Sequence, residues 1–143
     1  MTTAQANAHT ARLMYRLFTE NDVEGVVTLL AEDYELTDMA TGETIRGHDG
    51  FREWMRRSRE GLPDAVAEVM ALHQDENVVV AEVRNHGTHT GALTMPDGTV
   101  YPATGRRLDV RGCEVLRFHD RRIVSCTVYY DALSMAEQLD LHA

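Results

Sequence analysis

The sequence has no run of basic residues, no long apolar stretch and only two cysteines. The formal charge of -9 and the scattered arginines argue against nucleic acid and anionic membranes as partners, because both are polyanionic. No segment is long enough to span a membrane, and residues 1–10 lack an apolar signal segment. These absences predict a cytoplasmic protein whose partner is a small neutral or weakly charged molecule.

Several catalytic and metal-binding motifs are also missing. There is no glycine-rich phosphate loop and no serine or cysteine nucleophile motif. His86 and His89 would point to opposite faces of a strand, and no cysteine or carboxylate stands at ligand spacing nearby. We therefore expect no metal and no other cofactor, and we expect both cysteines to be reduced.

The length and the hydrophobic pattern suit one domain over residues 1–143, since 43% hydrophobic residues can build a core and no linker or repeat appears. Helical spacing predicts helices over residues 4–20, about 23–33 and 49–61. Period-two patterns predict strands over residues 34–38, 65–72, 78–90, 99 or 108–118 and 123–130. A short helix should follow Asp131.

Helices followed by a run of strands indicate an α+β domain. We expect a curved antiparallel sheet wrapped around the N-terminal helices, which forms a cone with an internal pocket. Polar residues on the inner face of such a cone are candidates for function.

Glu114 is the clearest of these candidates. Alternation over residues 110–118 places it on the same strand face as Val110, Leu116 and Phe118. A carboxylate there is costly unless it is paired, protonated through a raised pKa, or facing a ligand cavity. The structural alternatives to a functional role are an ion pair with Arg84 or Arg106, or a twist of the strand that turns Glu114 to solvent.

The chain resembles the SnoaL-like polyketide cyclases and ester cyclases of the nuclear transport factor 2-like superfamily. The resemblance covers residues 11–139, nearly the whole chain, and rests on these segments: FTENDV and LAEDY near the start, RG at residues 46–47, GTHTG at 87–91, ATGR at 103–106, LRFHDRRI at 116–123 and YD at 130–131. The resemblance implies the cone fold, a hydrophobic small-molecule substrate and a homodimer.

The resemblance also assigns roles to individual positions. The catalytic aspartate of the cyclases aligns with Val128, and their histidine aligns with Glu114, so the usual cyclase base is missing. The ketosteroid isomerases compare better, because their basic aspartate aligns with Asp38 and their protonated acid with Glu114. Their tyrosine donor aligns with Met14, beside Tyr15.

Asp38 and Glu114 form a chemically reasonable pair. Removing a proton beside a carbonyl group needs an ionised base and a donor for the developing enolate oxygen. Asp38, beside a polar turn, could stay ionised, and Glu114, on an apolar face, could stay neutral, the arrangement that is known in ketosteroid isomerase itself. For Asp38 the structural alternative is a turn residue that accepts from nearby backbone amides.

These observations predict a cofactor-independent enzyme of polyketide or other secondary metabolism that cyclises or isomerises a carbonyl substrate, with Asp38 as base and Glu114 as acid. A non-catalytic cone that binds a hydrophobic ligand or acts as an accessory protein is one alternative, and a hydrolase or dehydratase is another. We expect the substrate to contact Met14, Tyr15, Leu36, Trp54, Met55, His89, Leu116, Val128 and Tyr130.

The outer face of the sheet should form the interface of a homodimer. Val115 and Cys113 alternate with Arg111 and Arg117 there, a mixed apolar and charged surface that suits a two-fold interface.

Overall fold

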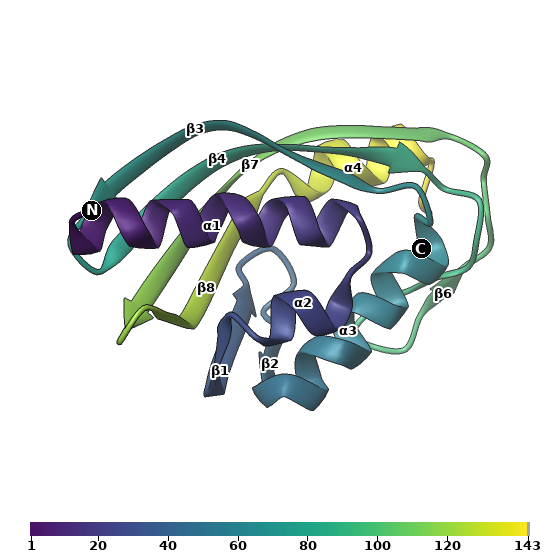
Figure 1. Ribbon diagram of the computed structural model, residues 1–143. Helices are drawn as coiled ribbons and strands as arrows, with labels where there is room; N and C mark the ends of the chain where they lie inside the picture. The colour runs from purple at the N-terminus through teal and green to yellow at the C-terminus, as the bar shows by residue number, and fades with distance from the viewer. Residues whose placement is uncertain (143) are drawn as a thin grey trace.

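A strongly curved sheet arches over the N-terminal helix in the computed structural model, which describes residues 1–142 (Figure 1). The helices are α1 (Thr3–Thr19), α2 (Val23–Val27), α3 (Gly47–Gly61) and α4 (Ala132–Leu139). The strands are β1 (Leu30–Asp38), β2 (Thr44–Arg46), β3 (Val66–Asp75), β4 (Val78–Thr88), β5 (Leu93–Thr94), β6 (Val100–Tyr101), β7 (Arg107–His119) and β8 (Arg122–Tyr130).

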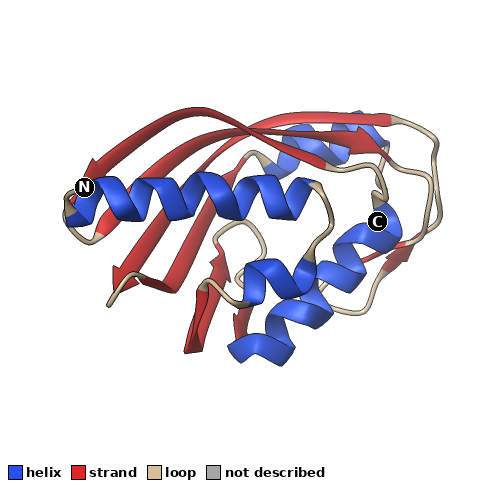
Figure 2. Ribbon diagram, in the orientation of Figure 1, coloured by secondary structure: helices blue, strands red, loops and turns tan. Residues whose placement is uncertain are grey.

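The main sheet has the strand order β2-β1-β8-β7-β4-β3, and β5 and β6 form a separate hairpin. Strand β4 pairs antiparallel with β3 and β7, and β7 pairs antiparallel with β8, whereas β1 lies parallel to β8. Figure 2 shows the helices gathered on the concave side of this sheet. The predicted α+β class with a curved, largely antiparallel sheet is confirmed.

Helix α1 lies along the inside of the arch (Figure 1). It begins with a capping box in which the Thr2 hydroxyl accepts from the Gln5 amide and the Gln5 side chain accepts from the Thr2 amide. Ala11, Met14 and Tyr15 are buried at the spacing that one helical face requires. This face brings Tyr15 to the inside of the sheet.

The second helix is shorter than the sequence pattern predicted. It is capped by Asp22, which accepts from the Gly25 amide at 2.9 Å, and it ends at Val27 instead of near residue 33. From Leu30 the chain runs as β1, with Leu30, Tyr34 and Leu36 buried. The apolar pattern fitted both a helix and a strand, and pairing of β1 with β8 decides for the strand.

Helix α3 closes one side of the cone through an aromatic cluster. The Phe51 and Trp54 rings lie 5.9 Å apart, and Trp54 lies 6.2 Å from Phe18 of α1. Arg59, near the end of α3, donates to the carbonyl oxygens of Phe18 and Ala65. These contacts fix α3 relative to both α1 and the start of β3.

The segment that carries the β5–β6 hairpin packs against the end of α3. Gly91 donates from its backbone amide to the Gly61 carbonyl oxygen at 3.3 Å. Leu93 then joins Leu62, Leu108 and Leu139 in a second buried cluster. Helix α4 and the hairpin therefore share one end of the cone.

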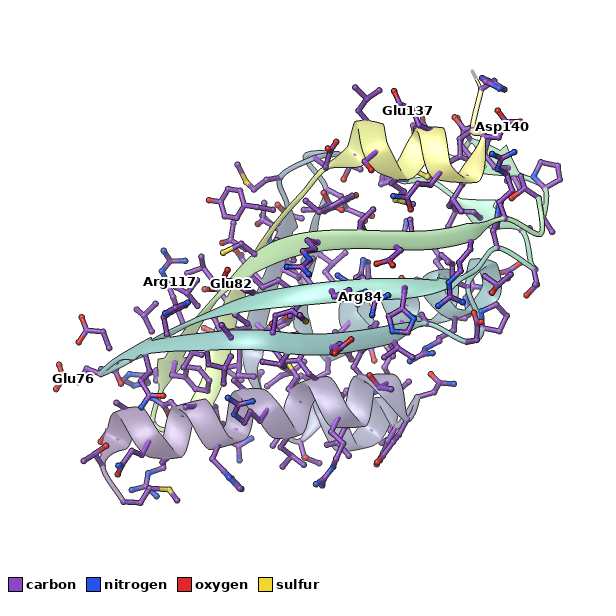
Figure 3. All side chains as sticks on the ribbon, turned by 90° about the horizontal axis from the view of Figure 1, so that it is seen from above. Glu76, Glu82, Arg84, Arg117, Glu137 and Asp140 are labelled. Carbon is purple, nitrogen blue, oxygen red and sulfur yellow. The ribbon has the colours of Figure 1, made fainter. Side chains whose placement is uncertain are left out.

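The outer face of β3, β4 and β7 is not covered by any helix among residues 1–142 (Figure 3). Arg84 lies on this face and forms ion pairs with Asp109 at 2.7 Å and Glu68 at 3.3 Å. Met70 and Tyr129 are 44% and 47% exposed.

The close approach at Gly91 gives the first prediction. A Cβ atom on Gly91 would overlap the carbonyl oxygen of Glu60, so Gly91→Ala should lower the free energy of unfolding by roughly 1–3 kcal/mol. Gly50→Ala is the matched control. Gly50 lies in α3, and the nearest atoms to a Cβ there would be those of Ile45, at an ordinary contact distance of 3.7 Å. The control should raise stability by up to about 1 kcal/mol. Urea unfolding measures both, and equal effects of the two changes would contradict the tight contact.

Candidate functional site

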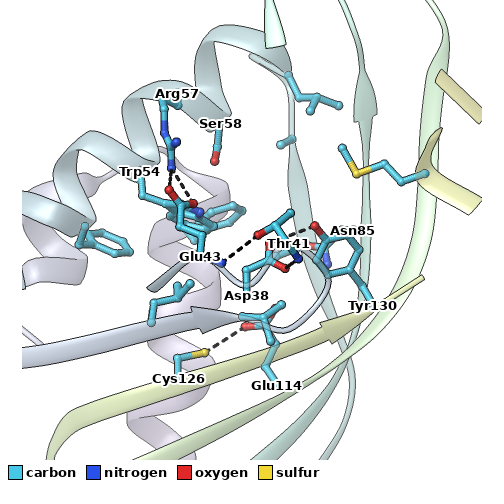
Figure 4. A pocket seen from close by; sticks show the side chains of 18 of the residues that line it. Asp38, Thr41, Glu43, Trp54, Arg57, Ser58, Asn85, Glu114, Cys126 and Tyr130 are labelled. Atoms are coloured by element: carbon cyan, nitrogen blue, oxygen red, sulfur yellow. Dashed lines mark hydrogen bonds and ion pairs between the residues drawn. The ribbon is translucent and has the colours of Figure 1, made fainter. Parts of the chain in front are cut away.

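An internal pocket of about 240 Å³ lies between the concave face of the sheet and helices α1 and α3 (Figure 4). Its lining is mainly apolar, with contributions from both helices, strands β1, β4, β7 and β8, and the β5 segment. The volume is slightly below the roughly 300–1,000 Å³ of common ligand pockets. A ligand of one or two rings fits a pocket of this size better than a large polycyclic compound.

Asp38 and Glu114 both line this pocket. Asp38 pairs with Val128 between β1 and β8, and Val128 pairs with Glu114 between β8 and β7. The three residues therefore form one row across three strands, with Val128 in the middle. Because neighbouring strands lie about 4.8 Å apart, about 10 Å separates the Cα atoms of Asp38 and Glu114.

Glu114 is held by two donors that converge on one oxygen. The Tyr15 hydroxyl donates to Oε1 at 2.9 Å, and the Cys126 thiol lies 3.7 Å from the same atom. Burial raises the pKa of Glu114 above its ordinary value, and these two donors oppose that shift only in part. Among residues 1–142 no group is hydrogen-bonded to Oε2. A proton on Oε2 would therefore be free to bind a ligand.

The pKa values of the groups around Glu114 are raised as well. Burial, followed by the charge of Glu114, raises the pKa of Tyr15. Burial likewise raises the pKa of the Cys126 thiol and of the Tyr34 hydroxyl beside it. The deep end of the pocket thus contains several un-ionised donors around one carboxyl group. The alternative that Glu114 pairs with Arg84 or Arg106 is wrong, because Arg84 pairs with Asp109 and Arg106 donates to the Gln138 carbonyl oxygen.

Asp38 lies at the end of β1 in a different environment. Its Oδ1 accepts from the backbone amides of Ala40 and Thr41 at 2.9 and 3.1 Å, as the turn alternative predicted. Its Oδ2 accepts from the Tyr130 hydroxyl at 3.0 Å, and Figure 4 shows this contact facing the pocket. Burial, and then the charge of Asp38, raises the pKa of Tyr130. Asp38 therefore has both the turn role and a place in the pocket.

The pocket contains most, but not all, of the residues expected to contact a substrate. Met14, Tyr15, Leu36, Trp54, Val128 and Tyr130 line it. Met55 and Leu116 do not, because both are 0% exposed within the main hydrophobic core. His89 also lies outside the lining residues, fully buried with its Nδ1 atom 2.9 Å from the Thr104 hydroxyl.

Several pocket residues were not predicted. Arg57 donates to both carboxylate oxygens of Glu43 at 2.8 Å, and both side chains are about four-fifths buried, at 18% and 20% exposed. Asn85 faces inward from β4. Nothing in the local pattern predicts that Glu43 and Arg57 meet, but alternation along β4 could have identified Asn85 in the way it identified Glu114.

No group of three or more histidine, cysteine or carboxylate side chains in residues 1–142 is arranged to hold a metal ion. None of the helices over the same residues is long and apolar enough to cross a membrane.

Solved structures with this fold come from several bacteria. A candidate SnoaL-like polyketide cyclase from Jannaschia sp. CCS1 superimposes with a TM-score of 0.87 at 14% identity, over 100% of this chain and 97% of that one. IdmH, a candidate polyketide cyclase from Streptomyces antibioticus, gives 0.78 at 24% identity, over 94% and 99%. A candidate polyketide cyclase from Xanthomonas campestris pv. campestris gives 0.84 at 21% identity, over 96% and 99%.

Identities at this level establish the shared fold. A comparison with curated proteins gives no match. The model of the SnoaL-like domain matches residues 11–126, which is most of the sequence and includes both Asp38 and Glu114. The chain therefore belongs to the SnoaL-like domain family.

Proposed function

We propose that this protein is a cofactor-independent acid–base enzyme that removes a proton beside a carbonyl group of a small hydrophobic substrate and so cyclises or isomerises it. The observation that carries the proposal is the row Asp38–Val128–Glu114, whose two carboxyl groups face one cavity from different environments. The resemblance to polyketide cyclases supports a polyketide or another secondary metabolite as the substrate.

Glu114 would bind the carbonyl oxygen, and Tyr15 would hold Glu114 in place. Burial raises the pKa of Glu114, which favours its protonated form, and Oε2 has no hydrogen-bond partner among residues 1–142. A hydrogen bond from Oε2 would stabilise the negative charge that develops on the carbonyl oxygen. Tyr15 would act through Glu114, because its hydroxyl donates to Oε1.

Asp38 would be the base. Among residues 1–142 its Oδ2 accepts only the one hydrogen bond from Tyr130, which leaves a lone pair on this oxygen to take a proton. The carbon–hydrogen bond breaks, its proton moves to Oδ2, and its electron pair forms the carbon–carbon double bond of the enol or enolate. That intermediate can attack an internal electrophile or take the proton back at another carbon. The chain has no lysine, so this route does not pass through a lysine Schiff base.

A non-catalytic ligand-binding cone is the second candidate function. One observation favours it: Val128 occupies the middle of the row, where the resemblance to the cyclases places their catalytic aspartate. The two candidates differ in one measurement, because a binding protein would take up a ketone without exchanging its α-protons.

Asp38→Asn tests the base. The amide can still accept from the Ala40 and Thr41 backbone amides, so the turn should persist, but it cannot take a proton. We expect exchange of the α-protons of 2-tetralone into heavy water, followed by NMR, to fall by about 10²–10⁴-fold. Asp120→Asn is the control, since its side chain is 90% exposed in a distant turn, and it should exchange at the wild-type rate. Unchanged exchange in Asp38→Asn would assign the base elsewhere.

Glu114→Gln tests the buried carboxyl group through stability. Above its ordinary pKa of 4.5 but below the raised pKa, Glu114 keeps a proton in the folded state that the unfolded chain has lost. The free energy of unfolding must therefore fall as pH rises through this window. Glutamine cannot titrate, so the stability of Glu114→Gln relative to wild type should rise with pH in urea unfolding from pH 4 upward.

The control for Glu114→Gln is Glu137→Gln, an exposed glutamate on α4 (Figure 3). Its stability relative to wild type should not show this rise. A stability difference for Glu114→Gln that stays constant with pH would show that Glu114 is not held protonated.

We also propose that two copies pair through the uncovered outer face of the sheet, where Figure 3 labels the charged residues Glu82, Arg84 and Arg117. Met70 of β3 and Tyr129 of β8, both exposed, alternate with inward-facing residues and so add apolar area to this face. Light scattering should give twice the mass of the 16.1 kDa chain at micromolar concentration. Arg117→Glu should shift the protein toward monomer, whereas Arg12→Glu, on the exposed side of α1, should not. A wild-type mass of one chain would rule out the dimer.

A further inference from the structure

Asn85 interrupts the apolar inner face of β4. The residues that precede it on that face, Val79, Ala81 and Val83, are 0%, 0% and 1% exposed. Asn85 continues the same alternation, lines the pocket and is half-buried. An inward amide here replaces the apolar side chain that the alternation calls for.

The strands on either side offer this amide no partner. Asn85 lies opposite Ala67 on β3 and opposite Val110 on β7, and both neighbours are buried and apolar. Within residues 1–142 no hydrogen bond is made by the Asn85 side chain. Its polar atoms are not sealed off either, because they are absent from the buried side-chain atoms that lack a partner. The amide therefore faces the cavity.

Nearby charged groups in the pocket already have partners. Arg57 is paired with Glu43, and the Tyr130 hydroxyl donates to Asp38. Asn85 is thus an uncharged group with two donors and one acceptor oxygen, open to whatever fills the cavity.

Asn85 also lies far along the strand from Glu114, the group proposed to bind the carbonyl oxygen. Glu114 pairs with Ala81 on β4, and Asn85 is four residues further along the same strand. At about 3.4 Å per residue the two positions are about 14 Å apart along the strand. Their side chains both reach into the cavity, so one elongated ligand can touch both.

We propose that Asn85 binds a second oxygen of the substrate, at the end opposite the carbonyl group. This inference rests on the proposed function for the position of the carbonyl group, and it names the substrate class: a neutral, largely apolar ketone of one or two rings with a hydroxyl or carbonyl oxygen at its far end. A neutral oxygen suits an uncharged amide, and the cavity holds only a small ring system. Asn85 is a positioning residue that fixes which α-carbon faces Asp38.

The test compares two probe ketones that differ in one oxygen, 2-tetralone and 6-hydroxy-2-tetralone. Their dissociation constants are measured by calorimetry with the wild-type protein and with Asn85→Leu, which keeps the size of the side chain but removes its polar atoms. The wild type should bind the hydroxy ketone roughly three- to tenfold more tightly, the usual worth of one hydrogen bond between neutral groups. Asn85→Leu should lose this preference and bind 2-tetralone within about twofold of wild type.

Ser58→Ala is the matched control, because Ser58 also lines the pocket and carries a hydroxyl group. It should keep the preference for the hydroxy ketone. If Asn85→Leu does not fold, Asn85→Ala replaces it in the same comparison. No preference in the wild type, or a preference that survives in the Asn85 variant, overturns the proposal. Equilibrium binding requires no proton transfer. If the wild type does not exchange α-protons but prefers the hydroxy ketone through Asn85, the proposed enzyme function is overturned and this inference stands.

Discussion

The desolvation of Glu114 is the constraint on which the site depends. A carboxyl group on the apolar face of a central strand is tolerated here because it lines a cavity, has a pKa that burial raises and accepts from Tyr15 and Cys126. Both donors reach the same oxygen. Among residues 1–142, Oε2 has no partner and is left for a ligand. The contacts that hold the side chain in the fold therefore also fix how it faces the cavity.

The sheet register turns this buried acid into half of a pair. A shift of one residue between β8 and either neighbour would turn Asp38 or Glu114 to the outer face. The parallel pairing of β1 with β8 is what brings the end of β1 beside the middle of β7. The site therefore depends on a contact between the first and last strands, and helix α1 adds Tyr15 to it from a third direction.

Much of the fold and part of the site could be predicted from the sequence, for reasons that differ between residues. The strands β3, β4, β7 and β8 follow a clear period of two, so their existence and the inward direction of Glu114 are local properties. The boundary between α2 and β1 could not be predicted, because residues 23–30 are apolar at positions that suit either element, and only pairing with β8 decides. Met55, Leu116 and His89 have the residue types of a pocket but lie in buried positions away from it. Whether an inward side chain packs in the core or lines a cavity depends on the residues of other elements that face it. The sequence pattern of one strand carries no information about those residues.

Asn85 and Glu114 illustrate why polar residues on inner faces are informative even without knowledge of that opposite wall. An apolar residue at either position would fit both a solid core and a cavity, so it carries no information about which is present. A polar residue fits only if something satisfies it. Tyr15 and Cys126 satisfy one oxygen of Glu114, while the Asn85 amide has no partner in the described part of the chain. On the proposed function, this difference describes the ligand: it would offer an acceptor to Glu114 and a neutral oxygen to Asn85, joined by an apolar body that matches the lining between them.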